Sequence, residues 1–285
     1  MVALRALAPV HTQPHVVAAY AFGAFSDDVC DRGPCEERAP RFDAWVRLVE
    51  AALAGGPVPH PLLAAYLHTM AVREQPRRWV DAYLAAARAD IGFAGFATED
   101  DYQAYVENLS LPFLMVTAGV LHPGGGGDAY VSAIRALADG CQRTDILADL
   151  AADLACGRLY LPTDALARHS VERHDVLRGQ SAPGLGTVIA EAVDQARTAL
   201  AAAQISVALV AEDCRPLQRA VLLLHHHRLT SIAALGAAVA RTPVRDSFAD
   251  CLRLLVAARG RGLHGPGAGF RSDERHTTVT LGERP

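Results

Sequence analysis

Acidic side chains recur at one-turn spacing between residues 142 and 156. Asp145, Asp149 and Asp153 follow one another at intervals of four residues, so a helix through them would carry all three on one face. Like charges at this spacing destabilise an isolated helix by roughly 0.2–0.5 kcal/mol per pair. The residues between them are apolar, which indicates that the helix is packed on several sides. Carboxylates directed into such an interior need a cation, and acids without cysteine or histidine neighbours favour Mg²⁺.

A second group of acids, Asp27, Asp28 and Asp31, directly follows an apolar helical stretch at residues 21–25. Asp27 and Asp31 are one helical turn apart and therefore lie on the same face. Two such faces opposite each other would hold a diphosphate through bridging Mg²⁺ ions. The alternative is a solvated acidic face neutralised by arginines, which is the usual explanation for one acidic face alone. Two such faces in one chain favour the metal site.

Helices must position both acidic faces, because helical periodicity dominates the chain. Apolar residues recur at three- and four-residue spacing in eight segments. These segments are residues 16–25, 42–54, 62–73, 79–89, 100–121, 129–156, 186–211 and 216–241. Strand-like alternation occurs only at residues 277–281. The pattern predicts an all-α helical bundle that forms a single domain over residues 1–259. Residues 260–285 are rich in Gly, Pro, Arg and His, so we expect a flexible C-terminal tail.

Composition narrows the class of protein further. The 285 residues carry a net charge of −4, and the arginines are interspersed with acids, so nucleic acid is not an expected partner. We find no run of about 18 uncharged apolar residues and no secretory signal pattern, so we expect a cytoplasmic protein without an integral membrane segment. The six cysteines are scattered through a long chain and are expected to be reduced thiols. The oligomeric state stays open.

The two acidic segments resemble the two aspartate motifs of the squalene and phytoene synthases. Residues 20–31 resemble the first motif. Residues 142–162 resemble the second motif and end in Gly-Arg-Leu-Tyr-Leu-Pro, which is similar to the family's trailing Gly-Arg-x-Tyr-x-Pro signature. Weaker similarity runs through residues 90–119, and the resemblance covers roughly residues 8–240. It implies the all-α isoprenoid synthase fold, a helical bundle around a central cavity.

The resemblance also implies roles for individual residues. It implies Mg²⁺–diphosphate ligation by four acids, Asp27, Asp31, Asp149 and Asp153. It places further groups near the diphosphate, namely Arg158, Tyr160, Gln142, Asp145, Asp28 and Tyr105, although Asp28 has no fixed direction within its motif. The implied reaction is metal-assisted ionisation of an allylic prenyl diphosphate to a carbocation, which requires a dry, apolar cavity with aromatic faces. The aromatic candidates are Phe22, Phe25, Tyr105, Phe113 and Tyr160.

Three departures from the family pattern bear on the acceptor. Asp145 stands where the family usually has Asn, and Ala148 stands where it usually has Arg. Only about twenty-five residues precede the first motif, so we expect no additional N-terminal helix with polar and aromatic groups for a second diphosphate. A more negative site disfavours two diphosphates. These departures favour a prenyltransferase that transfers a prenyl group to a carbon of a small aromatic acceptor of the carbazole or indole type. The favoured donor is dimethylallyl diphosphate.

The chain resembles, in these departures, squalene-synthase-like enzymes of bacterial secondary metabolism that prenylate an aromatic ring. Two alternatives remain at this point. One is a phytoene- or squalene-type synthase that joins two prenyl diphosphates head to head. The other is a non-catalytic relative of the family.

Three consecutive histidines, at residues 225–227, would point in different directions from a helix, so they make no metal site by themselves. One of them is a candidate for the wall of the acceptor pocket.

Overall fold

The computed structural model describes residues 2–93, 95–122, 127–179 and 182–260, and every regular element in these ranges is helical. The all-α prediction is therefore confirmed. The helices of the first half are α1 (Val2–Leu7), α2 (Gln13–Asp31), α3 (Cys35–Leu53), α4 (Pro61–Val72), α5 (Arg77–Asp90), α6 (Glu99–Tyr105), the π-helix η1 (Val106–Ser110), α7 (Leu111–Ala118) and the 3₁₀-helix η2 (Gly119–Leu121).

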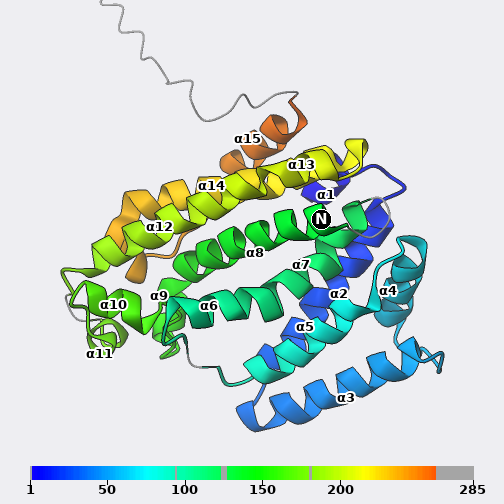
Figure 1. Ribbon diagram of the computed structural model, residues 1–285, viewed down its shortest axis with the longest axis horizontal. Coiled ribbons are helices and arrows are strands. Elements are labelled where there is room, and N and C mark those ends of the chain that lie inside the picture. Colours follow the sequence, from blue (N-terminus) through cyan, green and yellow to red (C-terminus); the bar gives the residue numbers. More distant parts are fainter. Residues whose placement is uncertain (1, 94, 123–126, 180–181, 261–285) are drawn as a thin grey trace, which may run out of the picture.

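The second half has two long helices against a central one. Its helices are α8 (Asp128–Ala148), α9 (Leu150–Ala155), α10 (Thr163–Arg168), α11 (Arg173–Leu177), α12 (Leu185–Ala202), η3 (Ala203–Ile205), α13 (Ser206–Leu209), η4 (Glu212–Cys214), α14 (Arg215–Leu235), η5 (Gly236–Ala240) and α15 (Phe248–Arg259). In Figure 1, α8 runs through the middle, with α12, α14 and α15 above it and α3 and α5 below. The two acidic segments are thus placed on long, packed helices.

Close helix–helix contacts depend on two glycines. A Cβ atom at Gly140 of α8 would lie 2.6 Å from the side chain of Leu200 on α12. A Cβ atom at Gly23 of α2 would lie 2.8 Å from the ring of Phe113 on α7. The missing side chains let α8 approach α12 and let α2 approach α7, so the backbones around the cavity come close together.

Local sequence signals explain where several helices begin. Pro14, Pro61 and Pro216 occupy the first turns of α2, α4 and α14, where proline's fixed φ suits a helix and its missing N–H is not needed. Thr98 and Ser247 form capping boxes at the starts of α6 and α15. The capped α15 was not among the predicted helices, because its apolar pattern is short and follows a segment rich in polar residues.

The structure also differs from the predicted elements inside the site. Helix α2 extends to Asp31, so the first acidic group lies within the helix and not after it. The predicted helix 129–156 is interrupted at Asp149, which separates α8 from α9. Hydrogen bonds from Asp149 N to Asp145 O and from Asp153 N to Asp149 O, both 2.9 Å, nevertheless keep the four-residue spacing. The strand-like residues 277–281 and residues 261–285 of the expected tail lie outside the described residues.

A short helix, α1, precedes α2 and contacts α14 and α15. Its sequence contains one arginine and no aromatic residue.

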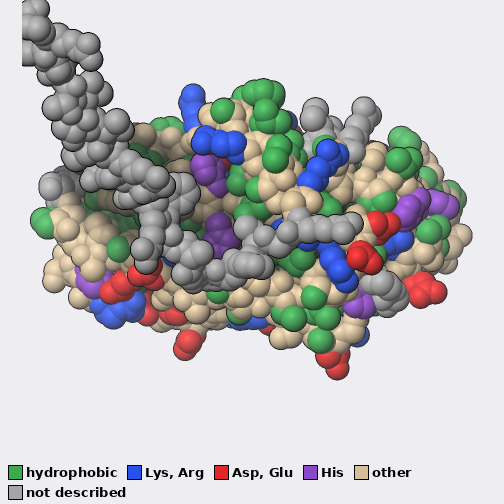
Figure 2. Space-filling model, turned by 90° about the horizontal axis from the view of Figure 1, so that it is seen from above, with side chains coloured by type: hydrophobic (Ala, Val, Ile, Leu, Met, Phe, Trp, Pro, Cys, Tyr) green, Lys and Arg blue, Asp and Glu red, His purple; other side chains and the backbone are tan. Residues whose placement is uncertain are grey.

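Charged side chains of both signs are visible on the face above α14 and α15, where the undescribed residues leave it uncovered (Figure 2). In Figure 2, arginines are dispersed among hydrophobic and acidic side chains on this face. Among the described residues, one helical stretch, Glu99–Leu121, has the length and apolar composition of a membrane span, and half of its most apolar window is buried inside the protein. Residues of this stretch line the cavity, so its apolar side chains pack inside the protein and form part of the cavity wall.

Candidate active site

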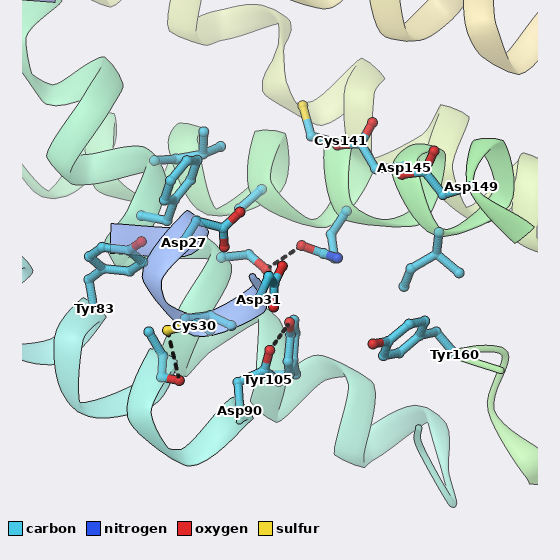
Figure 3. A pocket seen from close by; sticks show the side chains of 18 of the residues that line it. Asp27, Cys30, Asp31, Tyr83, Asp90, Tyr105, Cys141, Asp145, Asp149 and Tyr160 are labelled. Carbon is cyan, nitrogen blue, oxygen red and sulfur yellow. Dashed lines mark hydrogen bonds between the residues drawn. The ribbon is translucent and has the colours of Figure 1, made fainter. Parts of the chain in front are cut away.

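A cavity of about 400 Å³ lies between α2, α5, the α6–α7 stretch and α8. Figure 3 shows Asp27 and Asp31 on α2, Asp145 on α8 and Asp149 directly after α8 around the same space. All predicted site residues except Asp28 line it, namely Asp27, Asp31, Tyr105, Gln142, Asp145, Asp149, Asp153, Arg158 and Tyr160. Segments more than a hundred residues apart in the sequence thus meet around one space.

Asp28 is the predicted site residue that the fold places elsewhere. Its carboxylate lies 3.0 Å from the guanidinium of Arg32, one turn further along the chain, and it is about half exposed. It is not among the residues that line the cavity. On α2 it falls between Asp27 and Asp31 but points from a different face, as the helical period requires.

Two of the cavity acids are neutralised by arginines. Asp153 accepts from Arg158 at 3.1 Å, and Asp145 accepts from Arg228 of α14 at 3.2 Å. Four further acids of the cavity have no ion-pair partner among the described residues, and these are Asp27, Asp31, Asp90 and Asp149. The cavity therefore concentrates uncompensated negative charge.

This charge changes the acidity of the carboxyl groups. Partial desolvation, followed by repulsion from Asp31, Asp28 and Asp90, raises the pKa of Asp27 to about 6. Partial desolvation also raises the pKa of Asp90 to about 6, with a hydrogen bond from Tyr105 acting in the opposite direction and repulsion from Asp31 adding to the rise. A divalent cation placed between these groups would relieve both effects.

The donor set suits Mg²⁺ in combination with a phosphorylated ligand. The cavity offers carboxylate oxygens, which are the hard donors that Mg²⁺ prefers. No group of three or more His, Cys, Asp or Glu side chains in the described ranges is close enough together to form a metal site alone. Since Mg²⁺ commonly binds through one or two carboxylates, water and substrate phosphate, the residues fit a shared metal–diphosphate site.

Asp90 lines the same cavity, although its sequence context does not predict it as a site residue. It ends α5, and its Oδ2 atom accepts from the hydroxyl of Tyr105 at 3.4 Å, while its Oδ1 atom is buried without a protein partner. No spacing pattern connects Asp90 with the other acids. One signal was available, since an acid in the last turn of a helix is unfavourable with respect to the helix dipole and so needs another reason to be there.

An aromatic cluster holds the two tyrosines of the site. Phe93 and Phe96 follow α5, and Phe96 meets the ring of Tyr105 edge to face with 5.2 Å between centroids. The rings of Phe93 and Tyr160 are stacked at 6.1 Å, and the Arg158 guanidinium lies 6.0 Å from the centroid of Tyr160. Packing around Phe93 and Phe96, which sequence reasoning missed, thus fixes Tyr105 and Tyr160 at the cavity.

The cavity also has apolar lining residues, which come from α5, η1, α7 and α8. These residues are Leu109, Phe113, Leu114, Ala87 and Ala138. Two aromatic candidates from the sequence, Phe22 and Phe25, do not line the cavity, so that prediction was wrong for them. Phe22 stacks on Tyr66 with centroids 4.1 Å apart, and Phe25 packs on Trp45 at 4.8 Å. Both rings fill the space between α2, α3 and α4, because they lie on the side of α2 away from α8.

Gln142 is oriented by a neighbouring helix. The hydroxyl of Ser110 donates to Gln142 Oε1 at 2.9 Å. Ser110 ends the π-helix η1, where the N–H of Leu111 bonds to the carbonyl of Val106. The amide oxygen of Gln142 is thereby satisfied, and its NH₂ group is left to donate within the cavity.

Cys30 and Cys141 also line the cavity, and burial raises the pKa of each thiol, so both stay protonated.

Comparison with known proteins identifies related sequences. The family model described as squalene/phytoene synthase matches residues 2–249. The chain is 30% identical over 188 residues to the bifunctional protein CrtB/UppS of Streptomyces coelicolor, which is 64% of this chain and 32% of that protein. It is 29% identical over 198 residues to a phytoene synthase of Thermus thermophilus, covering 67% of this chain and 64% of that one. These matches span less than two thirds of either relative. A presqualene diphosphate synthase of Rhodopseudomonas palustris is 28% identical over 245 residues, which is 83% of this chain and 84% of that protein.

Solved structures share the fold. A dehydrosqualene synthase in complex with ligand superposes with a TM-score of 0.81 at 20% identity, covering 90% of this chain and 89% of that one. Squalene synthase HpnC from Alicyclobacillus acidocaldarius gives a TM-score of 0.74 at 24% identity, covering 82% and 88%. The all-α isoprenoid synthase fold that the sequence implied is therefore confirmed.

Proposed function

Since this chain belongs to the squalene/phytoene synthase family, we propose that it ionises an allylic prenyl diphosphate and joins the prenyl group head to head to a second prenyl diphosphate. The observation that carries the proposal is the set of cavity carboxylates without ion-pair partners in the described chain, with the pKa of Asp27 and Asp90 raised to about 6. The names of the relatives, which include phytoene and presqualene diphosphate synthases, support a second prenyl diphosphate as acceptor.

The charged lining residues are the proposed binding groups for Mg²⁺ and the diphosphate. Asp27, Asp31, Asp149 and Asp153 are the proposed holders of Mg²⁺, with Asp90 beside them. When bound, Mg²⁺ supplies Lewis-acid neutralisation of the charge on the leaving diphosphate. Arg158 is half exposed next to Asp153 and can donate to the same diphosphate, because its guanidinium has more donors than the one ion pair uses.

The remaining lining residues protect the cation. The side chains of Leu109, Phe113 and Leu114 exclude water from the carbon end of the substrate, and water would otherwise quench a carbocation. The faces of Phe96 and Tyr105 offer cation–π stabilisation within the same wall. The NH₂ group of Gln142 adds a neutral donor for the diphosphate.

A second candidate function is prenyl transfer, with dimethylallyl diphosphate as donor, to a carbon of a carbazole- or indole-type aromatic in secondary metabolism. The charge of the cavity favours it specifically. Six carboxylates line the cavity and Arg158 is the one arginine that does so among the described residues. A second diphosphate would bring more negative charge into this space, whereas a neutral aromatic acceptor would not. The relatives support head-to-head condensation better, so aromatic transfer stands second. Retention of the acids on both sides of the cavity counts against a non-catalytic relative.

One product screen tests both functions. The protein is incubated with Mg²⁺ and farnesyl or geranylgeranyl diphosphate alone, and in parallel with dimethylallyl diphosphate and a panel of tricyclic aromatics. Head-to-head condensation predicts a C30 or C40 product without acceptor, detected by liquid chromatography and mass spectrometry. A C-prenylated aromatic, with no hydrocarbon from the long diphosphates, would replace the first proposal by the second. An Asp149→Asn variant serves as the inactive control and Asp28→Asn as the active one.

The proposed location is the cytoplasm. The stretch Glu99–Leu121, which has the composition of a membrane span, lines the cavity and is half buried. Fractionation of cells that express the protein, followed by a carbonate wash of the membrane pellet, tests this. Recovery in the washed pellet would contradict it.

A further inference from the structure

A run of three histidines and an arginine on α14 connects the cavity to the start of α15. Arg228 Nη1 lies 3.2 Å from Asp145 Oδ1, and its Nη2 lies 2.9 Å from Asp246 Oδ2. His225 Nε2 lies 3.8 Å from the same Asp145 oxygen, and His227 Nε2 lies 3.7 Å from Asp250 Oδ2. Asp145 lines the cavity, so the run joins a cavity acid to side chains outside it.

Asp246 fixes the direction of the Arg228 guanidinium. Nε of Arg228 donates to Asp246 Oδ2 at 3.0 Å, and Nη2 lies within ion-pair distance of the same oxygen, which leaves Nη1 to donate to Asp145. Arginine suits this role, because its planar group can donate to two carboxylates at once and stays charged at any physiological pH. His225 is buried, and its Nδ1 lies 2.8 Å from the carbonyl of Val221, so the ring is also fixed in place beside Asp145.

Asp145 would be harmful to anion binding without these partners. It lies on the cavity face of α8, one helical turn before Asp149. Desolvation raises the pKa of Asp145, and repulsion from Asp149 adds to this rise. An additional uncompensated carboxylate here would oppose the entry of a diphosphate. The chain supplies the compensating cation from another helix, α14.

We propose that Arg228 is a positioning residue for diphosphate binding, which acts by holding Asp145 against α14 and neutralising it in place. The proposal rests on the proposed function only in requiring that the cavity bind a metal-bound diphosphate. It explains the acid and the arginine as one coupled pair. Replacement of Asp145 by Asn should therefore make Arg228 dispensable, whereas an arginine that touched the diphosphate itself would be needed in either background.

A double-mutant cycle tests the coupling. Binding of inorganic pyrophosphate in the presence of Mg²⁺ is measured by isothermal titration calorimetry for wild type, Arg228→Gln, Asp145→Asn and the double variant. Arg228→Gln should weaken binding by about tenfold or more, because a carboxylate loses its partner. The double variant should return to within about threefold of wild type. Arg215→Gln, at the other end of α14 in an exposed pair with Glu212, is the matched control and should bind normally.

A steady-state readout separates positioning from a structural role. Arg228→Gln should raise KM for the prenyl diphosphate more than it lowers kcat, and Asp145→Asn should rescue it. If Arg228→Gln does not fold, as judged by circular dichroism, Arg228→Lys in both backgrounds replaces it. A loss is still expected because lysine cannot donate to both acids with the same geometry, and it should be smaller because lysine keeps the positive charge.

Each outcome has a definite meaning. A double variant as weak as Arg228→Gln, or an Arg228→Gln variant that binds like wild type, overturns the proposal. If wild type binds no Mg²⁺–pyrophosphate, the proposed function and this inference both fall. If wild type binds pyrophosphate but makes no head-to-head product, only the proposed function falls, and the cycle still decides the role of Arg228.

Discussion

Tyr105 donates its hydroxyl hydrogen to Asp90, with 3.4 Å between the Tyr105 oxygen and Asp90 Oδ2, and both residues line the cavity. The bond joins the end of α5 to the end of α6. It stabilises the ionised form of Asp90 and lowers its pKa, against the larger effect of desolvation. The tyrosine thus helps to keep a cavity acid charged at neutral pH.

Removal of this bond should shift the pH dependence of the site. In Tyr105→Phe the pKa of Asp90 should rise above about 6, so half-maximal Mg²⁺-dependent pyrophosphate binding should require a higher pH. Calorimetric titrations between pH 5 and 8 measure this, with the exposed Tyr20→Phe as control. An unchanged pH midpoint would show that Asp90 takes no part in binding.

Stability without metal should fall as pH rises from about 4 to 7. Asp27 and Asp90 have folded-state pKa values raised to about 6 from 3.8, so the folded protein binds more protons than the unfolded chain in this window. The stability that protonation contributes is therefore present at low pH and is lost as pH rises through the folded pKa. Thermal melts at several pH values in EDTA check the direction, and Mg²⁺ with pyrophosphate should reverse the loss at pH 7.

Metal removal should abolish turnover. Carboxylates and Arg158 are the charged groups that line the cavity in the described chain, so the diphosphate depends on added cations for neutralisation. Product formation is followed in EDTA and after addition of excess Mg²⁺, which should restore it. Full activity in chelator would contradict the ionisation mechanism.

Loss of a cavity acid should damage catalysis but not folding. Asp27→Asn or Asp149→Asn should lower kcat by about a hundredfold or more, whereas the melting temperature in EDTA should stay the same or rise, because a repulsive neighbour has been removed. Asp28→Asn, which loses only an exposed pair with Arg32, is the matched control and should retain activity. Near-normal turnover in either cavity variant would remove that acid from the proposed site.

Freeing the amide of Gln142 should weaken substrate binding. Ser110→Ala removes the hydroxyl that holds Gln142 Oε1, so the amide can rotate. KM for the prenyl diphosphate should rise about two- to tenfold, the equivalent of one hydrogen bond. Thr117→Ala is the control, since that hydroxyl donates only to carbonyls of its own helix. Equal KM values for the two variants would argue against an oriented amide.

Periodicity and spacing predicted the helical fold and both acidic faces, because a helix converts a four-residue interval directly into a shared direction. The contributions of Asp90 and Arg228 could not be read in this way. Asp90 meets Tyr105 only after α5 and α6 have packed, and Arg228 reaches Asp145 from a helix eighty-three residues further along the chain. Phe22 and Phe25 were misplaced because helical spacing identifies a buried face but not which neighbour covers it.

The π-helix at Val106–Ser110 has a consequence for how this cavity can change over evolution. A π turn contains one residue more than an α turn, so it accommodates one extra residue between two α-helical segments that keep nearly the same register. Deletion of one residue there would leave an ordinary α turn, so Tyr105 before it and Phe113 and Leu114 after it would keep nearly the same directions. A single-codon deletion can thus remove the local bulge that carries Ser110, and with it the contact to Gln142, while the aspartates, Tyr105 and the apolar wall stay where they are.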